Sequence, residues 1–167
     1  MISIEILNNR VPEEIIKKII EAINREYPFL RITGVRSVKL PLESYNASRK
    51  QYNATLILSK LEKMKKTDYL LIVTSSDLYA GDMNFIFGEA IFYSCAVLSI
   101  ARLKTFALIQ KEAVHEVGHV LGLQHCKLPC VMTFSNSIYD ASKKSGSLCE
   151  KCRKKLDRYM GEEYLGK

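Results

Sequence analysis

The stretch HEVGHVLGLQH, residues 115–125, holds all three histidines of the 167-residue chain. Apolar residues at helical spacing predict a helix over about 105–122 that contains His115 and His119. A separation of four residues places the two imidazoles on one helix face, about 40° apart around the axis and about 6 Å apart along it. Two imidazoles in this arrangement can bind one zinc ion at about 2.0–2.1 Å from each nitrogen.

The residues that follow extend this pair to a three-histidine site. Gly122 is suited to end the helix in a left-handed conformation, which lets His125 approach the same ion from outside the helix. Three neutral imidazoles leave one coordination position open for water, as catalytic zinc sites do, and Glu116 comes near enough to contact that water. The HExxH pattern alone occurs by chance in many helices, so the set positions of Gly122 and His125 carry the prediction.

Four cysteines form a second candidate metal site. Cys126 and Cys130 are spaced C-x3-C, and Cys149 and Cys152 are spaced C-x2-C. Each pair can supply two thiolate ligands to one ion, and the four thiolates together complete a tetrahedral structural site with no open position. The region that they span has the weakest periodicity of the chain, so a metal ion there would replace apolar core that the sequence lacks.

Two other arrangements compete with this assignment. The cysteines could form two disulfides, although nothing in the sequence indicates secretion. Alternatively, His119 or His125 could join Cys126 and Cys130 in one mixed site. We predict two zinc ions, one catalytic and one structural, because this partition uses all seven ligands in two chemically sensible groups. Cys95 lies apart in an apolar stretch and is expected to be a small buried core residue.

The rest of the chain predicts an α/β fold. Segments of alternating type precede the histidines: a strand at 2–7, a helix at 13–27, a strand at 31–40, a helix at 51–65 and a strand at 68–75. This β-α-β-α-β order favours parallel strands joined by right-handed connections, with helices packed on the sheet. Two further strands are expected at 84–88 and 91–100, an irregular region at 123–147 and a helix at about 150–159.

Composition indicates one soluble globular domain, with 47% hydrophobic and 26% charged residues. The net charge of +7 persists if four thiolates and two zinc ions are present, since their charges cancel. We interpret the basic stretch 143–158 as a solvated charged face rather than a site that attracts acidic substrates. Nucleic-acid binding is disfavoured, because the sequence shows no recognition helix and its aromatic residues do not interleave with the basic stretch. The start of the chain lacks a secretory signal and no apolar run is long enough to cross a membrane, so we expect a cytoplasmic location and no membrane partner. A monomer is favoured, although the sequence does not disclose the oligomeric state.

The two metal motifs together resemble those of a known family. The sequence HEVGHVLGLQHCKLPCVM, residues 115–132, followed by CEKC at 149–152, is similar to the signature of the archaemetzincins, which are metzincin-like zinc peptidases. Their signature reads HExxHxxGxxxC, then xxxxCxM, then CxxC, so the first cysteine pair here is one residue shorter. The segments NFIFGEA and AVLSIARL, within 84–103, also look like the family's sequence before the active-site helix.

This resemblance implies a metzincin-like zincin fold of the α/β (α+β) class. A twisted mixed β-sheet with packed helices would lie above the cleft and the active-site helix at its base. The single catalytic domain 1–167 would comprise an upper subdomain, about 1–122, and a small zinc-stabilised lower subdomain, about 123–167. The resemblance also implies that Met132 packs beneath the three histidines as the Met-turn residue.

The expected function is that of a zinc-dependent metallopeptidase. Peptide bonds would be hydrolysed by a zinc-bound water, with Glu116 as general base. A peptide or protein substrate would pair with an edge strand, for which 84–88 is the candidate. Tyr139 is a weaker candidate for stabilising the oxyanion, and an ordinary structural role is favoured for it. The alternative is a catalytically silent zinc-binding module, or a nucleic-acid-binding module built on the four-cysteine site and the basic carboxy terminus.

Overall fold

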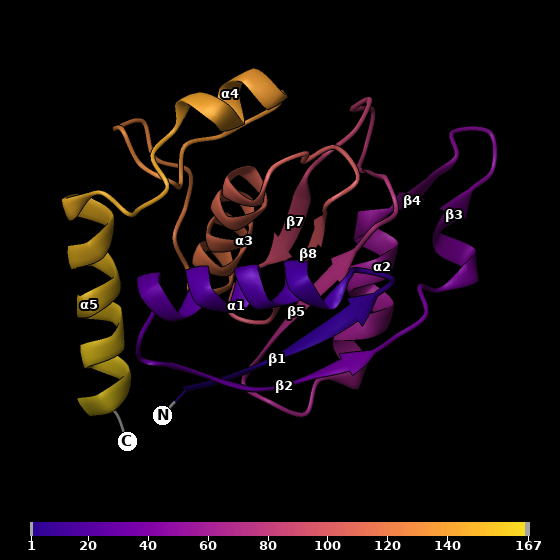
Figure 1. Cartoon of the computed structure of the whole chain (residues 1–167). Helices are drawn as coiled ribbons and strands as arrows, with labels where there is room; N and C mark the ends of the chain where they lie inside the picture. The colour runs from indigo at the N-terminus through magenta and orange to yellow at the C-terminus, as the bar shows by residue number, and fades with distance from the viewer. Residues whose placement is uncertain (1, 166–167) are drawn as a thin grey trace.

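A twisted five-stranded sheet forms the centre of the molecule in this computed structural model (Figure 1), which describes residues 2–165 without the side chains of 162–165. Four strands are parallel and the edge strand β7 is antiparallel to its neighbour β8. In spatial order the strands are β2 (Leu30–Ser37), β1 (Ile2–Asn9), β5 (Tyr69–Thr74), β8 (Cys95–Ser99) and β7 (Gly88–Ile91). The predicted α/β class and the parallel order of the first three strands are confirmed.

Helices cover both faces of this sheet, which explains why its central strand is apolar along its whole length. Helices α1 (Glu13–Glu26) and α3 (Phe106–Val120) pack on one face, and α2 (Ala54–Leu61) packs on the other. In β5, alternate residues enter the two cores: Tyr69, Leu71 and Val73 face α1 and α3, whereas Leu70 and Ile72 face α2. A continuous apolar run is what a parallel strand buried on both faces requires.

The last two strands differ from their predicted positions. The segment 84–88 forms no strand of the main sheet except at Gly88, and only Ile86 pairs, in an isolated bridge to Leu78. The predicted strand 91–100 combined the end of β7, a turn and β8. Tyr93 occupies that turn with a φ of 62°. The predicted strand at 84–88 was wrong because Phe85, Ile86 and Phe87 are apolar for another reason: they line the cleft described below and do not belong to a strand.

A small second sheet was not predicted from the sequence. It consists of β3 (Tyr45–Asn46), β4 (Gln51–Asn53) and β6 (Leu78–Tyr79), in that order. The helix predicted at 51–65 therefore begins three residues later, where the Asn53 side chain accepts a hydrogen bond from the Leu56 amide as an N-cap. The chain also makes short 3₁₀ turns at Leu42–Ser44 and Glu62–Met64.

The carboxy-terminal region is more helical than predicted. The segment 123–147 contains a short helix, α4 (Ile138–Lys143), which is capped by the Ser137 hydroxyl. The final helix α5 extends over Glu150–Leu165, beyond the predicted 150–159. Among the described helices, none combines the length and the apolar character that a membrane span requires.

The end of α1 joins this region to the core. The buried Glu26 carboxylate accepts the Leu148 amide at 2.8 Å and forms an ion pair with Arg153 of α5. Next to it, the fully buried Tyr27 hydroxyl donates to the Val114 carbonyl of α3 at 2.8 Å. These contacts fix α3, α5 and the loops between them against α1.

Candidate active site

The three histidines lie close together at the end of α3. His115 and His119 lie one helical turn apart, and Gly122 then turns the chain with a φ of 98°, which a side chain would strain. His125 comes back to the pair, so that the ligand nitrogens of all three lie within 4.8 Å of one another. A Cβ at Gly122 would also collide with the Tyr93 ring, whose nearest atoms would lie 2.6 Å from it.

Hydrogen bonds set the protonation of the two helical histidines. The Nδ1 atom of His115 is 2.8 Å from the Val131 carbonyl oxygen, and that of His119 is 2.7 Å from the Leu123 carbonyl oxygen. Because a carbonyl only accepts, each Nδ1 carries the hydrogen and each Nε2 presents a lone pair.

The two Nε2 atoms are 3.1 Å apart, so two lone pairs face each other. Burial is the main cause that lowers the pKa of both rings, that of His119 to about 4, and so favours the neutral form that binds metals. A cation shared by the nitrogens would remove the repulsion between the lone pairs. The donor set therefore fits zinc.

Glu116 lies beside the histidines with one oxygen uncommitted. Its side chain is 3% exposed, and its Oε2 atom has no hydrogen-bond partner among the described residues. Burial, and secondarily the charge of Glu112, raise the pKa of Glu116 well above its ordinary value. Gly88 at the start of β7 makes room for this carboxylate, since a Cβ there would lie 2.6 Å from the Glu116 Cδ atom. Sequence reasoning did not identify Gly88, because nothing local distinguishes it from other strand glycines.

A buried ion pair lies behind His115. The Lys144 ammonium is 2.9 Å from the Glu112 carboxylate and 3.3 Å from the His115 Nδ1 atom. It also donates to the Thr133 carbonyl at 3.1 Å. The interpretation of 143–158 as a solvated basic face is thus wrong for Lys144, which is 7% exposed. Its partner stands 32 residues earlier in the chain, so sequence reasoning had no signal for the pair.

The four cysteines form a second cluster, separate from the histidines. Their Sγ atoms lie within 4.8 Å of one another, and the described residues contain no disulfide. Backbone amides donate to the sulfurs: Met132 and Cys149 to Cys130, at 3.4 and 3.3 Å, and Cys152 to Cys149, at 3.4 Å. Although burial opposes it, the Cys152 amide and the neighbouring thiols lower the pKa of Cys149 to about 7. A thiol that ionises this readily, in a group of four, suits a soft metal ion such as zinc.

Two further residues singled out from the sequence take different positions. Met132 is fully buried against α3, where a Cβ on Gly118 would lie 2.4 Å from its Sδ atom. Gly118 is thus the residue that lets Met132 approach the helix between the two histidines. Tyr139 is 66% exposed with Lys143 over its ring and is not among the residues that line the cleft.

A cleft of about 610 Å³ opens over the histidines. Edge strand β7 forms part of its wall, and two exposed aromatic rings flank the histidines. Phe92 stacks on His119 with ring centroids 5.4 Å apart, and Phe134 lies 5.1 Å from the His125 ring. The segment 80–87, which leads into β7, forms a further part of the wall and contributes Ala80, Met83, Phe85, Ile86 and Phe87.

Comparisons with known proteins agree with this geometry. The model of peptidase family M54 matches residues 8–158. The archaemetzincin of Archaeoglobus fulgidus is 51% identical over 69% of this chain and 74% of that protein, and that of Pyrococcus furiosus is 37% identical over 93% and 92%. The crystal structure of the Methanopyrus kandleri archaemetzincin superimposes with a TM-score of 0.87 and 33% identity, covering 96% of each chain. That of the A. fulgidus protein, complexed with malonate, gives 0.85 and 39% identity over 92% of this chain and 99% of the other.

Proposed function

Because this chain belongs to peptidase family M54, the archaemetzincins, and is a zinc metallopeptidase, we propose that Glu116 is the general base of its peptide-bond hydrolysis. His115, His119 and His125 hold the catalytic zinc in this proposal. One observation carries it. The Nε2 atoms of His115 and His119 lie 3.1 Å apart, each with a lone pair. Beside them is the buried Glu116 carboxylate, whose Oε2 atom has no hydrogen-bond partner among the described residues.

Each residue of the site then has a distinct task. Zinc, when bound, supplies a Lewis acid that activates water and polarises the scissile carbonyl. The Glu116 carboxylate takes the proton from the water and passes it to the leaving amine, for which a raised pKa is suited. The Val131 and Leu123 carbonyls hold the imidazoles of His115 and His119 in the tautomer and orientation that binding needs.

The substrate in this proposal is an extended peptide that pairs with β7. This strand is the last in the sheet order, so no strand among residues 2–165 lies beside its outer backbone groups. An extended peptide can add to such an edge through main-chain hydrogen bonds. The cleft beside β7 would then bring the scissile bond over the histidines and Glu116.

The four-cysteine cluster is proposed to hold a second, structural zinc ion, which gives two ions per chain. Four thiolates leave no open position, so this ion would stabilise the lower subdomain, about 123–167, rather than react. The upper subdomain, about 1–122, would provide the sheet and α3 within one domain. A monomer in the cytoplasm remains our expectation. Family membership does not favour the alternative of a silent zinc-binding or nucleic-acid-binding module.

Peptide-library digestion of the zinc-loaded protein beside a Glu116→Gln variant tests the mechanism. The substitution keeps the side-chain shape but removes the base, so cleavage should fall by about 10²–10⁴-fold. Elemental analysis should find two zinc ions per chain in both proteins. Cleavage at the wild-type rate by Glu116→Gln would remove Glu116 from this role, and a single ion per chain would contradict the two-site assignment.

A further inference from the structure

The cleft wall formed by residues 80–87 is held in place mainly by contacts from elsewhere in the chain. Five of its residues line the cleft, yet the segment contains no regular strand or helix. Its backbone makes three hydrogen bonds to other backbone groups among the described residues: the Ile86 amide donates to the Leu78 carbonyl at 3.0 Å, the Met83 amide donates to the Ala80 carbonyl at 3.2 Å, and the Phe87 carbonyl accepts from the Ser99 amide of β8 at 2.7 Å. Since so few backbone bonds fix its conformation, its shape depends on the side chains that contact it.

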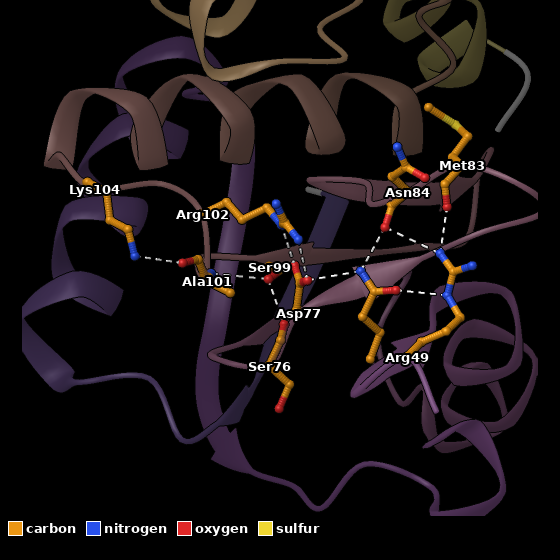
Figure 2. A network of polar contacts seen from close by, with 10 residues as sticks. Arg49, Ser76, Asp77, Met83, Asn84, Ser99, Ala101, Arg102 and Lys104 are labelled. Atoms are coloured by element: carbon orange, nitrogen blue, oxygen red, sulfur yellow. Dashed lines mark hydrogen bonds and ion pairs between the residues drawn. The ribbon is translucent and has the colours of Figure 1, made fainter. Parts of the chain in front are cut away.

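Arg102 supports the middle of this wall. Its guanidinium makes two hydrogen bonds to the Asp77 carboxylate, at 2.9 and 2.8 Å (Figure 2). The same guanidinium lies over the Phe85 ring, 4.1 Å from its centroid. Phe85 in turn packs edge-to-face with Phe87, with centroids 5.4 Å apart. A planar guanidinium can bind a carboxylate with two bonds and stack on an aromatic ring at once, so Arg102 fixes the position of Phe85 relative to Asp77.

Arg49 and Gln51 hold the start of the wall by its backbone. Arg49 donates to the Met83 carbonyl at 2.7 Å and to the Asn84 carbonyl at 3.3 Å. Gln51 donates from one amide nitrogen to the Asn84 carbonyl at 2.8 Å and to the Asp77 carboxylate at 2.9 Å. Asp77 therefore connects the two supports, because it accepts from both Gln51 and Arg102.

We propose that Arg49, Gln51, Asp77 and Arg102, called the brace below, are positioning residues that determine which substrate side chains the cleft accepts. This inference rests on the proposed function of the site. The surface that the brace holds is apolar and aromatic, through Met83, Phe85 and Phe87. The substrates selected are peptides with a large apolar side chain next to this wall, which binds it by burial of apolar surface. The small sheet contributes Gln51 from β4, and Arg49 lies just before that strand.

Substitution of Arg102 by Met tests the brace, with Lys104→Met as the matched control. Lys104 lies two residues away in the same loop, is exposed, and donates only to the nearby Ala101 carbonyl at 2.9 Å (Figure 2). Hydrogen exchange of the peptide 78–88 should become about tenfold faster in Arg102→Met. The methionine makes neither the hydrogen bonds to Asp77 nor the cation–π contact with Phe85, so local opening of the segment costs less free energy. Exchange in Lys104→Met should equal that of the wild type.

The same proteins are compared on peptides that differ in one side chain, large and apolar or alanine. In Arg102→Met, the selectivity for the large side chain should fall about tenfold, with the loss in KM rather than in kcat, since binding to the wall is what changes. Arg102→Lys should recover only part of it, because an ammonium cannot make the two-bond contact and the stack together. Arg49→Met should change exchange and selectivity in the same direction from the other end of the brace.

The outcomes separate this inference from the proposed function. If the wild type cleaves but Arg102→Met and Arg49→Met keep its selectivity, the brace does not select substrates. Unchanged exchange over 78–88 in both variants would show that the brace does not position the wall. If neither the wild type nor Lys104→Met cleaves any peptide, the proposed function fails, while the exchange measurement still decides whether the brace holds the wall.

Discussion

At two positions of this site, one added carbon atom would displace a functional side chain, and Gly88 is the clearest case. The Glu116 carboxylate is buried against the start of β7, where hydrogen is the largest substituent that the space allows. The same applies to Gly118, which lets Met132 approach α3 between two histidines. Both glycines are required by the close approach of neighbouring atoms and not by unusual backbone angles, since neither has a positive φ.

Gly88→Ala should inactivate the enzyme without removing its metal. The added Cβ would lie 2.6 Å from the Glu116 carboxylate and 2.7 Å from the Val97 carbonyl oxygen, so the carboxylate must move. We expect peptide cleavage to fall by about 10²–10⁴-fold, as on loss of a general base, with zinc content unchanged by elemental analysis. Gly34→Ala is the control, because nothing lies within 4 Å of its added Cβ. Full activity in Gly88→Ala would mean that Glu116 is not needed at its present position.

The Lys144–Glu112 pair should behave as a buried ion pair in mutagenesis. Lys144→Met leaves Glu112 as an uncompensated buried charge, and the free energy of unfolding should fall by about 3–5 kcal/mol. The double variant Glu112→Gln/Lys144→Met should recover most of this loss, and the exposed neighbour substitution Lys143→Met should cost little. Urea unfolding at one fixed concentration of free zinc measures these variants beside the wild type. Additive losses in the double variant would contradict the pairing.

At the scale of elements, prediction from the sequence succeeded where a signal is long and local. Strand β5 is a run of six buried residues, and the spacing of His115 and His119 with Gly122 after them defines α3 and its end. The small sheet escaped prediction because its strands have two or three residues and depend on distant partners. For example, the Tyr52 amide pairs with the Asp77 carbonyl at 2.9 Å.

Loss of one cysteine ligand should loosen the carboxy-terminal elements first. Cys149→Ser should reduce zinc to one ion per chain and speed hydrogen exchange over 126–152, because the proposed ion would hold the two cysteine pairs of that region together. Cys95→Ala is the control: Cys95 is buried in β8, and burial raises the pKa of its thiol to about 11. Two ions retained by Cys149→Ser would show that this thiol is not a ligand.

At the scale of the molecule, two apolar cores support the sheet from its two faces. One lies between β1, β5 and β8 and the helices α1 and α3, and it continues to Met132 and Leu156. The other lies beneath α2 and includes neither cysteine nor histidine of the metal clusters. The sheet therefore owes its stability to apolar burial. In our proposal, the region after α3 depends in addition on the metal ion held by the four cysteines.

Removal of zinc by a chelator should accordingly lower the hydrogen-exchange protection of one part of the protein and leave that of the other part unchanged. Removal of zinc restores the repulsion between the histidine lone pairs and releases the cysteine cluster, so exchange over 123–152 should rise strongly. Strands β1, β5 and β8 should keep their protection, because their packing needs no metal. Exchange measured by mass spectrometry at fixed pH, before and after chelation, tests this. Uniform loss of protection across the sheet would contradict it.

Glu26 has a consequence for how the protein is made. It binds Leu148 and Arg153, which are separated from it by 122 and 127 residues in sequence. A ribosome adds about 5–20 residues per second from the amino terminus, so α1 emerges many seconds before these partners. During that interval the Glu26 carboxylate stays solvated and the histidine helix lacks the carbonyl of Val131. The site is therefore completed only after residues 148–153 have been made, when the parallel strands of the sheet have already been available to assemble.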